Sequence, residues 1–180
     1  MRTLQTRFRL LLSFLIVLSF GLCLTAGAVS PVLLKEDFET VVDGLPSGWT
    51  LAAPGPMGLS TEYVFSGATS FYMEDLSNQS AVTIRSFHIP VEAGQEYMAS
   101  IWAMVIKGNA FLYMEFWSSP DEPRIHFVTD RIEASKEWQQ LVTKEVAPEN
   151  AVSMTITLSL IRNNVGKTYY DNLEVVKVEE

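Results

Sequence analysis

Short segments in which apolar and polar residues alternate, each followed by a turn signal, occupy most of this 180-residue chain. Residues 96–106 (EYMASIWAMVI) and 110–118 (AFLYMEFWS) are two such segments, joined by a hairpin-like break at 107–109. Alternation with a period of two is typical of half-buried strands, and breaks every ~8–12 residues are typical of all-β sandwiches and barrels. No segment shows convincing helical periodicity. We therefore expect an all-β fold, a two-sheet antiparallel β-sandwich of the jelly-roll type.

The expected strands follow one another to the end of the chain. Stretches that contain several prolines, at 53–58 and 118–124, separate some of them as loops. About nine or ten strands are expected. They cover residues 33–40, a short stretch after the turn at 44–50, and residues 70–77, 81–91, 96–106, 110–118, 125–132, 138–146, 153–161 and 167–178.

The first 28 residues predict a secretory signal peptide. Three arginines precede the apolar run at 10–24, and Ala-Gly-Ala at 26–28 has the small-x-small pattern of a cleavage site. Cleavage after Ala28 would leave residues 29–180 as a single secreted domain. An uncleaved membrane anchor is the alternative interpretation.

Charge and cysteine content narrow the classes of function. The chain has 13 Lys and Arg against 21 Asp and Glu, a formal net charge of −8. This acidity argues against nucleic acid and against an anionic membrane surface as partners. The single cysteine, Cys23, lies in the expected signal peptide, so the secreted domain would contain no disulfide. A domain of this length can bury a self-sufficient core without one.

Five motifs occur in order along the chain. They are KEDFET…GLPSGWT (35–50), VFSGATSFYM (64–73), VEAGQEYMASIWAMV (91–105), EWQQLVTKEVAP (137–148) and YYDNLEV (169–175). Together they resemble the motifs of carbohydrate-binding modules that have a galactose-binding-like jelly roll, beginning with an FE…GxPxGW signature. The resemblance implies that fold, a polysaccharide or other glycan as the ligand, and core positions for Trp49 and Trp138.

The resemblance also implies a structural calcium ion. In this family a Glu of the FE segment and an Asp of the closing strand often share one, and the matching residues here are Glu39 and Asp171. Calcium takes about six to eight hard oxygen ligands. Backbone carbonyls around residues 66–67 are a candidate source of the remainder. Glu36 and Asp37 are alternative carboxylates.

An interpretation without a metal is also open. Asp and Asn are disfavoured inside strands, so Asp171 and Asn172 predict a β-bulge in which side-chain oxygens accept hydrogen bonds from backbone N–H groups. Glu39 would then be only a solvated side chain.

Several strands combine an apolar face with a face that mixes aromatic and polar side chains. Sugars suit a mixed face, because their C–H groups stack on aromatic rings and their hydroxyls bond to a few placed polar groups. We therefore predict a glycan site on the concave face of one sheet. Its residues would be Trp102, Tyr113, Glu115 and Trp117, with Arg124 and His126 as rim donors.

Two alternatives stay open for these residues. Trp102 would pack in the interior if a loop such as 50–60 covered it. An exposed aromatic patch is equally typical of a secreted structural or adhesion module that binds a protein partner. Any bulge also reverses which face a side chain occupies.

The sequence favours a binding protein over an enzyme. There are only two histidines, His88 and His126, and the motifs of serine hydrolases, zinc proteases and phosphate-binding loops are absent. Glycoside hydrolysis needs two carboxylates. Glu115 is the best-placed acid, but we expect no second acid beside it on the same face. The expected module is therefore non-catalytic.

Overall fold

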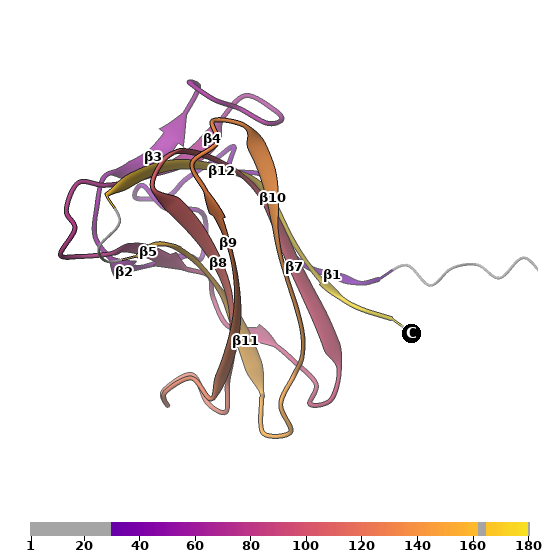
Figure 1. Ribbon diagram of the computed structural model, residues 1–180. Helices are drawn as coiled ribbons and strands as arrows, with labels where there is room; N and C mark the ends of the chain where they lie inside the picture. Colours follow the sequence, from indigo (N-terminus) through magenta and orange to yellow (C-terminus); the bar gives the residue numbers. More distant parts are fainter. Residues whose placement is uncertain (1–29, 162–164, 180) are drawn as a thin grey trace, which may run out of the picture.

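The computed structural model describes residues 30–161 and 165–179 and shows a sandwich of two antiparallel sheets (Figure 1). The first sheet has the order β10-β7-β12-β4-β3, with β1 beside β12, and the second has the order β2-β5-β11-β8-β9, with β6 beside β11. The strands of the first sheet are β1 (Val32–Glu36), β3 (Met57–Ser60), β4 (Ser70–Asp75), β7 (Glu96–Lys107), β10 (Trp138–Val146) and β12 (Gly166–Lys177). Those of the second are β2 (Thr50–Ala53), β5 (Val82–Arg85), β6 (Ile89–Pro90), β8 (Asn109–Trp117), β9 (His126–Glu133) and β11 (Ser153–Leu160).

The predicted fold class is confirmed, with differences in detail. The expected strand at 81–91 is interrupted and forms β5 and β6, which both pair with β11. The expected loop at 53–58 ends in β3, which pairs with β4 and extends the first sheet. Proline and glycine made this segment resemble a loop, but β3 is an edge strand, where such residues are tolerated.

The core lies between the two sheets, on the inner faces that alternation predicted. On β7 the side chains from Tyr97 to Val105 at every second position are buried, and on β8 the buried inner residues include Leu112 and Phe116. Trp49 is buried as predicted. Trp138 is not in the core: it pairs with Met104 on the outer face of the first sheet and lies edge-to-face against Phe65. Its place at the first residue of an edge strand explains the error.

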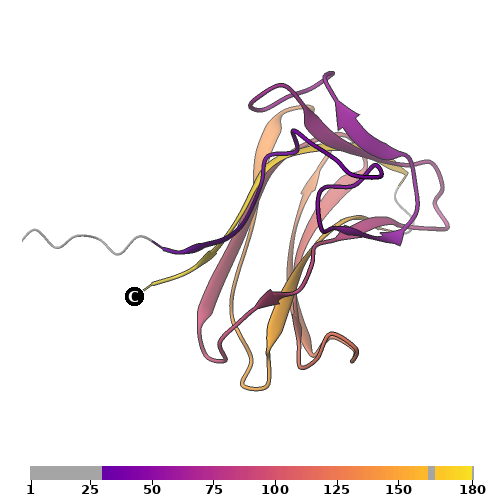
Figure 2. The same ribbon diagram turned by 180° about the vertical axis from the view of Figure 1, so that it is seen from behind.

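The described ends of the chain lie side by side. β1 runs antiparallel to the last part of β12, from Val32 beside Val176 to Glu36 beside Leu173. Figures 1 and 2 show both strands leaving the sandwich at the same edge. The predicted signal peptide at 1–28 lies outside the described residues. Within the described part, the chain forms no helix long and apolar enough to cross a membrane.

The predicted bulge at Asp171 and Asn172 is present. The register between β12 and β7 shifts between Asp171 and Glu174, and Asn172 has a positive φ of 48°. The left-handed conformation suits Asn better than most residues because its short polar side chain bonds locally. The Asn172 amide donates to Ser66 Oγ at 2.9 Å. The bulge therefore links the last strand to the loop of residues 61–69.

Candidate functional site

The outer face of the second sheet carries the mixed aromatic and polar surface. Tyr113 on β8 lies opposite Thr157 on β11, which in turn lies opposite Arg85 on β5. Figure 1 shows β11 bending so that this outer face is on the concave side. A cavity of about 200 Å³ opens on it, lined by Thr83, Arg85, Tyr113, Glu115, Arg124, Thr157 and Ser159.

Glu115 is the centre of a hydrogen-bonded network at the floor of this cavity. Its side chain is only 1% exposed. Oε1 accepts a hydrogen bond from Arg124 Nη1, and Oε2 accepts bonds from Arg85 Nε at 3.1 Å and Thr157 Oγ1 at 2.9 Å. A buried carboxylate is tolerated when cations and hydroxyls satisfy both of its oxygens. Glu115 therefore positions the two arginines, although the sequence predicted that it would face the ligand.

Trp117 contacts Arg85, which lines the cavity, but does not line the cavity itself. Its side chain is 8% exposed, and its indole Nε1 donates to Thr155 Oγ1 at 3.0 Å. The Arg85 guanidinium lies 5.2 Å from the ring centroid, and the His88 ring packs edge-on against it. The predicted role as an exposed stacking platform is therefore wrong, because Arg85 and His88 cover the ring.

The rings that are open to a ligand belong to Tyr113 and Phe127. Tyr113 is half-buried, and burial raises the pKa of its hydroxyl, so the phenol stays neutral. Phe127 is 43% exposed, lies opposite Glu115, and has its centroid 6.0 Å from that of Tyr113. Arg124 lies over one face of the Phe127 ring at 4.3 Å, and Phe127 lies beside the lined cavity rather than in it. The sequence analysis missed Phe127, although the alternation of β9 placed it on the face opposite to His126.

Two of the predicted site residues lie elsewhere. Trp102 is on β7 in the first sheet, where it stacks on Phe65 of the loop at 61–69 with centroids 4.3 Å apart. A loop covers Trp102, as the alternative interpretation expects, but the loop is 61–69 rather than 50–60. His126 lies opposite Phe116, on the inward side of β9, and its Nε2 is 3.4 Å from Glu145 of β10. The prediction that all six side chains share one face is therefore wrong for these two.

Trp102 lines a separate cavity on the outer face of the first sheet. This cavity has a volume of about 230 Å³ and is lined by Lys35, Ser100, Trp102, Gln140, Asn172, Leu173 and Glu174. Because Trp102 belongs to the opposite sheet from Tyr113, one ligand-binding surface cannot include both.

The two predicted calcium ligands converge on the loop at 61–69. Asp171 Oδ2 accepts hydrogen bonds from the backbone N–H groups of Phe65 and Ser66 at 2.9 and 3.0 Å. Glu39 Oε1 accepts one from the N–H of Ala68 at 2.8 Å. The carboxylates thus bind the backbone of one loop that lies far from both of them in the sequence.

The donor set fits a cation in part. Asp171 is fully buried, and its Oδ1 makes no hydrogen bond within the described residues. Burial raises the pKa of Asp171, and the neighbouring charge of Glu39 acts in the same direction. Oxygen atoms in this state suit a bound cation. Among the described residues no group of three or more Asp, Glu, His or Cys side chains converges, so carbonyl oxygens would have to complete the shell.

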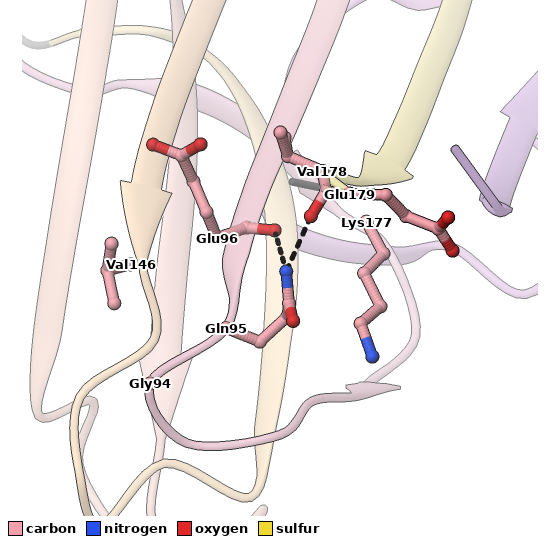
Figure 3. Close-up of a pocket in the computed structure, with 7 residues that line it drawn as sticks. All are labelled: Gly94, Gln95, Glu96, Val146, Lys177, Val178 and Glu179. Carbon is pink, nitrogen blue, oxygen red and sulfur yellow. Dashed lines mark hydrogen bonds between the residues drawn. The ribbon is translucent and has the colours of Figure 1, made fainter. Parts of the chain in front are cut away.

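A third cavity is less suited to specific binding. It has a volume of about 670 Å³ and lies near the described C-terminal end, lined by Gly94, Gln95, Glu96, Val146, Lys177, Val178 and Glu179. Figure 3 shows Gln95 bonded to the carbonyls of Glu96 and Val178. Glu96 and Lys177 are already in ion pairs with Lys144 and Glu92. No aromatic ring lines this cavity.

Comparisons with known proteins were made by sequence and by structure. No protein-family model matches the sequence, and no curated protein is similar to it. Solved structures do match. The enzymatically active domain of bacteriophage CBA120 tailspike protein 4 has a TM-score of 0.62 at 16% identity, over 73% of this chain and 20% of that one. A Clostridium thermocellum xylanase, which combines a family 22 carbohydrate-binding module with its catalytic module, is matched over 29% of its own length.

Isolated binding modules match over nearly their whole length. A xylan-binding domain of family 22 from Paenibacillus barcinonensis has a TM-score of 0.61 at 13% identity, over 86% of this chain and 99% of that domain. A family 61 module in complex with β-1,4-galactotriose has a TM-score of 0.59 at 16% identity, over 83% of this chain and all of that one. The chain therefore shares the β-sandwich fold of these modules, the fold class that its sequence predicted.

Proposed function

We propose that the protein is a non-catalytic carbohydrate-binding module that holds a poly- or oligosaccharide on the outer face of its second sheet. The observation that carries the proposal is the network of Arg85, Glu115 and Arg124 beside the open rings of Tyr113 and Phe127. Aromatic rings supply apolar contact for the C–H face of a sugar, and fixed polar groups orient its hydroxyls. The fold shared with modules that bind xylan and galactotriose supports this reading.

The same network argues for binding without catalysis. Glycoside hydrolysis uses two carboxyl groups on either side of the scissile bond. Among the residues that line the cavity, Glu115 is the only acid, and hydrogen bonds occupy both of its oxygens. A carboxylate held in this way cannot approach a glycosidic oxygen or activate water. We propose secretion on the signal-like segment at 1–28.

We also propose that Glu39 and Asp171 hold a structural calcium ion, with carbonyl oxygens of the nearby backbone. Its contribution would be to neutralise two carboxylates that lie close together and to fix the loop at 61–69 against the last strand. The free Oδ1 of Asp171 supports this proposal.

The function is tested by removing an exposed ring from the proposed face. We expect Phe127→Ala to weaken glycan binding about tenfold, since a lost stacking contact of ~1.4 kcal/mol corresponds to that factor. A glycan-array screen of the purified protein first identifies a glycan that it binds. The affinity of each variant for that glycan is then measured by calorimetry. Tyr113→Ala should have an effect of the same order.

The matched control is Phe65→Ala in the loop at 61–69, which packs on Trp102 of the opposite sheet. Phe65 is about as exposed as Phe127 and is truncated in the same way. Phe65→Ala should therefore leave the glycan affinity unchanged. Equal loss in both variants would place the site elsewhere. A folded protein that binds no plant, microbial or host glycan would refute the function.

A further inference from the structure

Charge in the concave cavity restricts the class of glycan, provided that the proposed function holds. The cavity is lined by two arginines and one acid. The acid, Glu115, is buried with both oxygens engaged, so the ionic groups that a ligand meets are the two guanidinium groups. They have side-chain exposures of 31% for Arg85 and 42% for Arg124. The site is locally cationic on a chain whose net charge is −8.

Each guanidinium also keeps donors to spare. Arg85 uses Nε to bond Glu115 and Thr157, and Arg124 uses Nη1 to bond Glu115. Within the described residues, the two Nη atoms of Arg85 and the remaining nitrogens of Arg124 donate no hydrogen bond. Arginine binds planar oxyanions through paired N–H groups, and side chains already held in place lose little entropy on doing so.

The neighbouring hydroxyl groups complete a surface rich in donors. Thr83 and Ser159 bond to each other at 2.8 Å, and the hydroxyl of Thr157 donates to Glu115. No carboxylate in the cavity remains free to accept hydrogen bonds from the hydroxyls of a neutral sugar. Burial lowers the pKa of His88, and the charge of Arg85 lowers it further, whereas Asp121 acts in the opposite direction.

We infer that the glycan bound here carries an anionic group, a uronate carboxylate or a sulfate ester, which Arg85 and Arg124 bind while a sugar ring lies on Tyr113 and Phe127. The strongly acidic chain repels polyanions in general. Binding of this kind therefore requires a local pair of cations, as this cavity provides.

The test compares matched pairs of oligosaccharides by calorimetry. One pair is a uronate-substituted xylo-oligosaccharide and the same backbone without the uronate. A second pair is a sulfated galacto-oligosaccharide and its desulfated form. We expect the charged member of one pair to bind at least about tenfold more tightly, and the advantage to shrink as salt is raised, because exposed charges are screened. The pair that shows the difference identifies the anion.

Variants of Arg124 separate charge from geometry. Arg124→Gln should lower affinity for the charged member about tenfold, since one ion pair is lost. Affinity for the neutral member should fall by no more than about threefold, since the glutamine amide still donates a hydrogen bond. Arg124→Lys should recover only part of the lost affinity, because lysine restores the charge but not the paired N–H groups of a guanidinium. The control is Arg131→Gln: Arg131 lies on β9, on the same face as Phe127 and opposite Phe111, outside the cavity lining.

The outcomes separate this inference from the function itself. Equal, salt-independent binding of charged and neutral members refutes the anionic ligand and leaves the glycan-binding function standing. A preference for charged members that survives Arg124→Gln unchanged also refutes it. The function itself is refuted only if the folded wild-type protein binds no member of either pair and no glycan on an array.

Discussion

At the scale of the residue, Glu115 shows how one side chain organises a surface that it does not itself present. It lies beneath the cavity, and the positions of Arg85 and Arg124 depend on its two oxygens. A buried carboxylate costs desolvation energy, which charge-assisted hydrogen bonds must offset. Removing it would leave two guanidinium groups without their common partner.

We expect Glu115→Ala to lower the free energy of unfolding by about 1–3 kcal/mol, less than for a fully buried pair because both arginines are partly exposed. Urea denaturation followed by tryptophan fluorescence measures the change. Glu133→Ala is the matched control: Glu133 is 3.6 Å from Arg131 at the surface, and its loss should change stability by less than about 0.5 kcal/mol. Equal effects would mean that the network at Glu115 contributes no more than a surface ion pair.

At the scale of the element, the bulge in β12 and the loop at 61–69 act as one unit. Asp171 binds the backbone of Phe65 and Ser66, and Phe65 stacks on Trp102. Gly67 is the tightest point: its φ is +72°, and an added Cβ would overlap the Glu39 carboxylate. A side chain at this position would therefore displace the Glu39 carboxylate from the loop.

Gly67→Ala should destabilise the fold more than Gly94→Ala. Gly94 has a similar φ of +80°, but an added Cβ there meets nothing within 4 Å, so its variant reports only the left-handed strain of about 1–2 kcal/mol. Gly67→Ala adds the displaced carboxylate, and we expect a further loss of about 1 kcal/mol or more. Thermal unfolding of both variants gives the comparison, and equal losses would show that Glu39 moves away at no cost.

At the scale of the whole molecule, β1 and β12 bring the two ends of the described chain together, and Glu39 and Asp171 meet at the same loop. An ion bound there would stabilise the native state only, by an amount that grows with calcium concentration. With calcium at 100 times its dissociation constant the gain would be about 2.7 kcal/mol.

The protein treated with EDTA should therefore melt at a lower temperature than the protein with saturating calcium, as measured by calorimetry. Asp171→Asn should abolish the difference. Asp37→Asn, which alters the exposed alternative carboxylate, should preserve it. Identical melting with EDTA and with calcium, and no calcium by mass spectrometry, would rule out the ion.

Alternation and turns predicted the fold class and most of the core, because inward and outward positions follow directly from the period of a strand. They could not predict which strands share a sheet. Trp102 and Tyr113 both face outward, but from opposite sheets, and only the pairing of β7 with β10 and β12 reveals this. The sequence also could not show that the Trp117 ring is covered, because Arg85 covers it from a strand about thirty positions earlier in the chain.

The arrangement of Arg85 and Arg124 around Glu115 affects both the free-energy cost of ordering side chains on binding and the rate of association. Side chains that search many rotamers before a ligand arrives must be ordered during binding, at about 0.5–1.5 kcal/mol each. Here part of that ordering is completed when the chain folds, so encounter need not wait for the arginines to be arranged. Association would then be limited by diffusion and by the shape of the sugar chain.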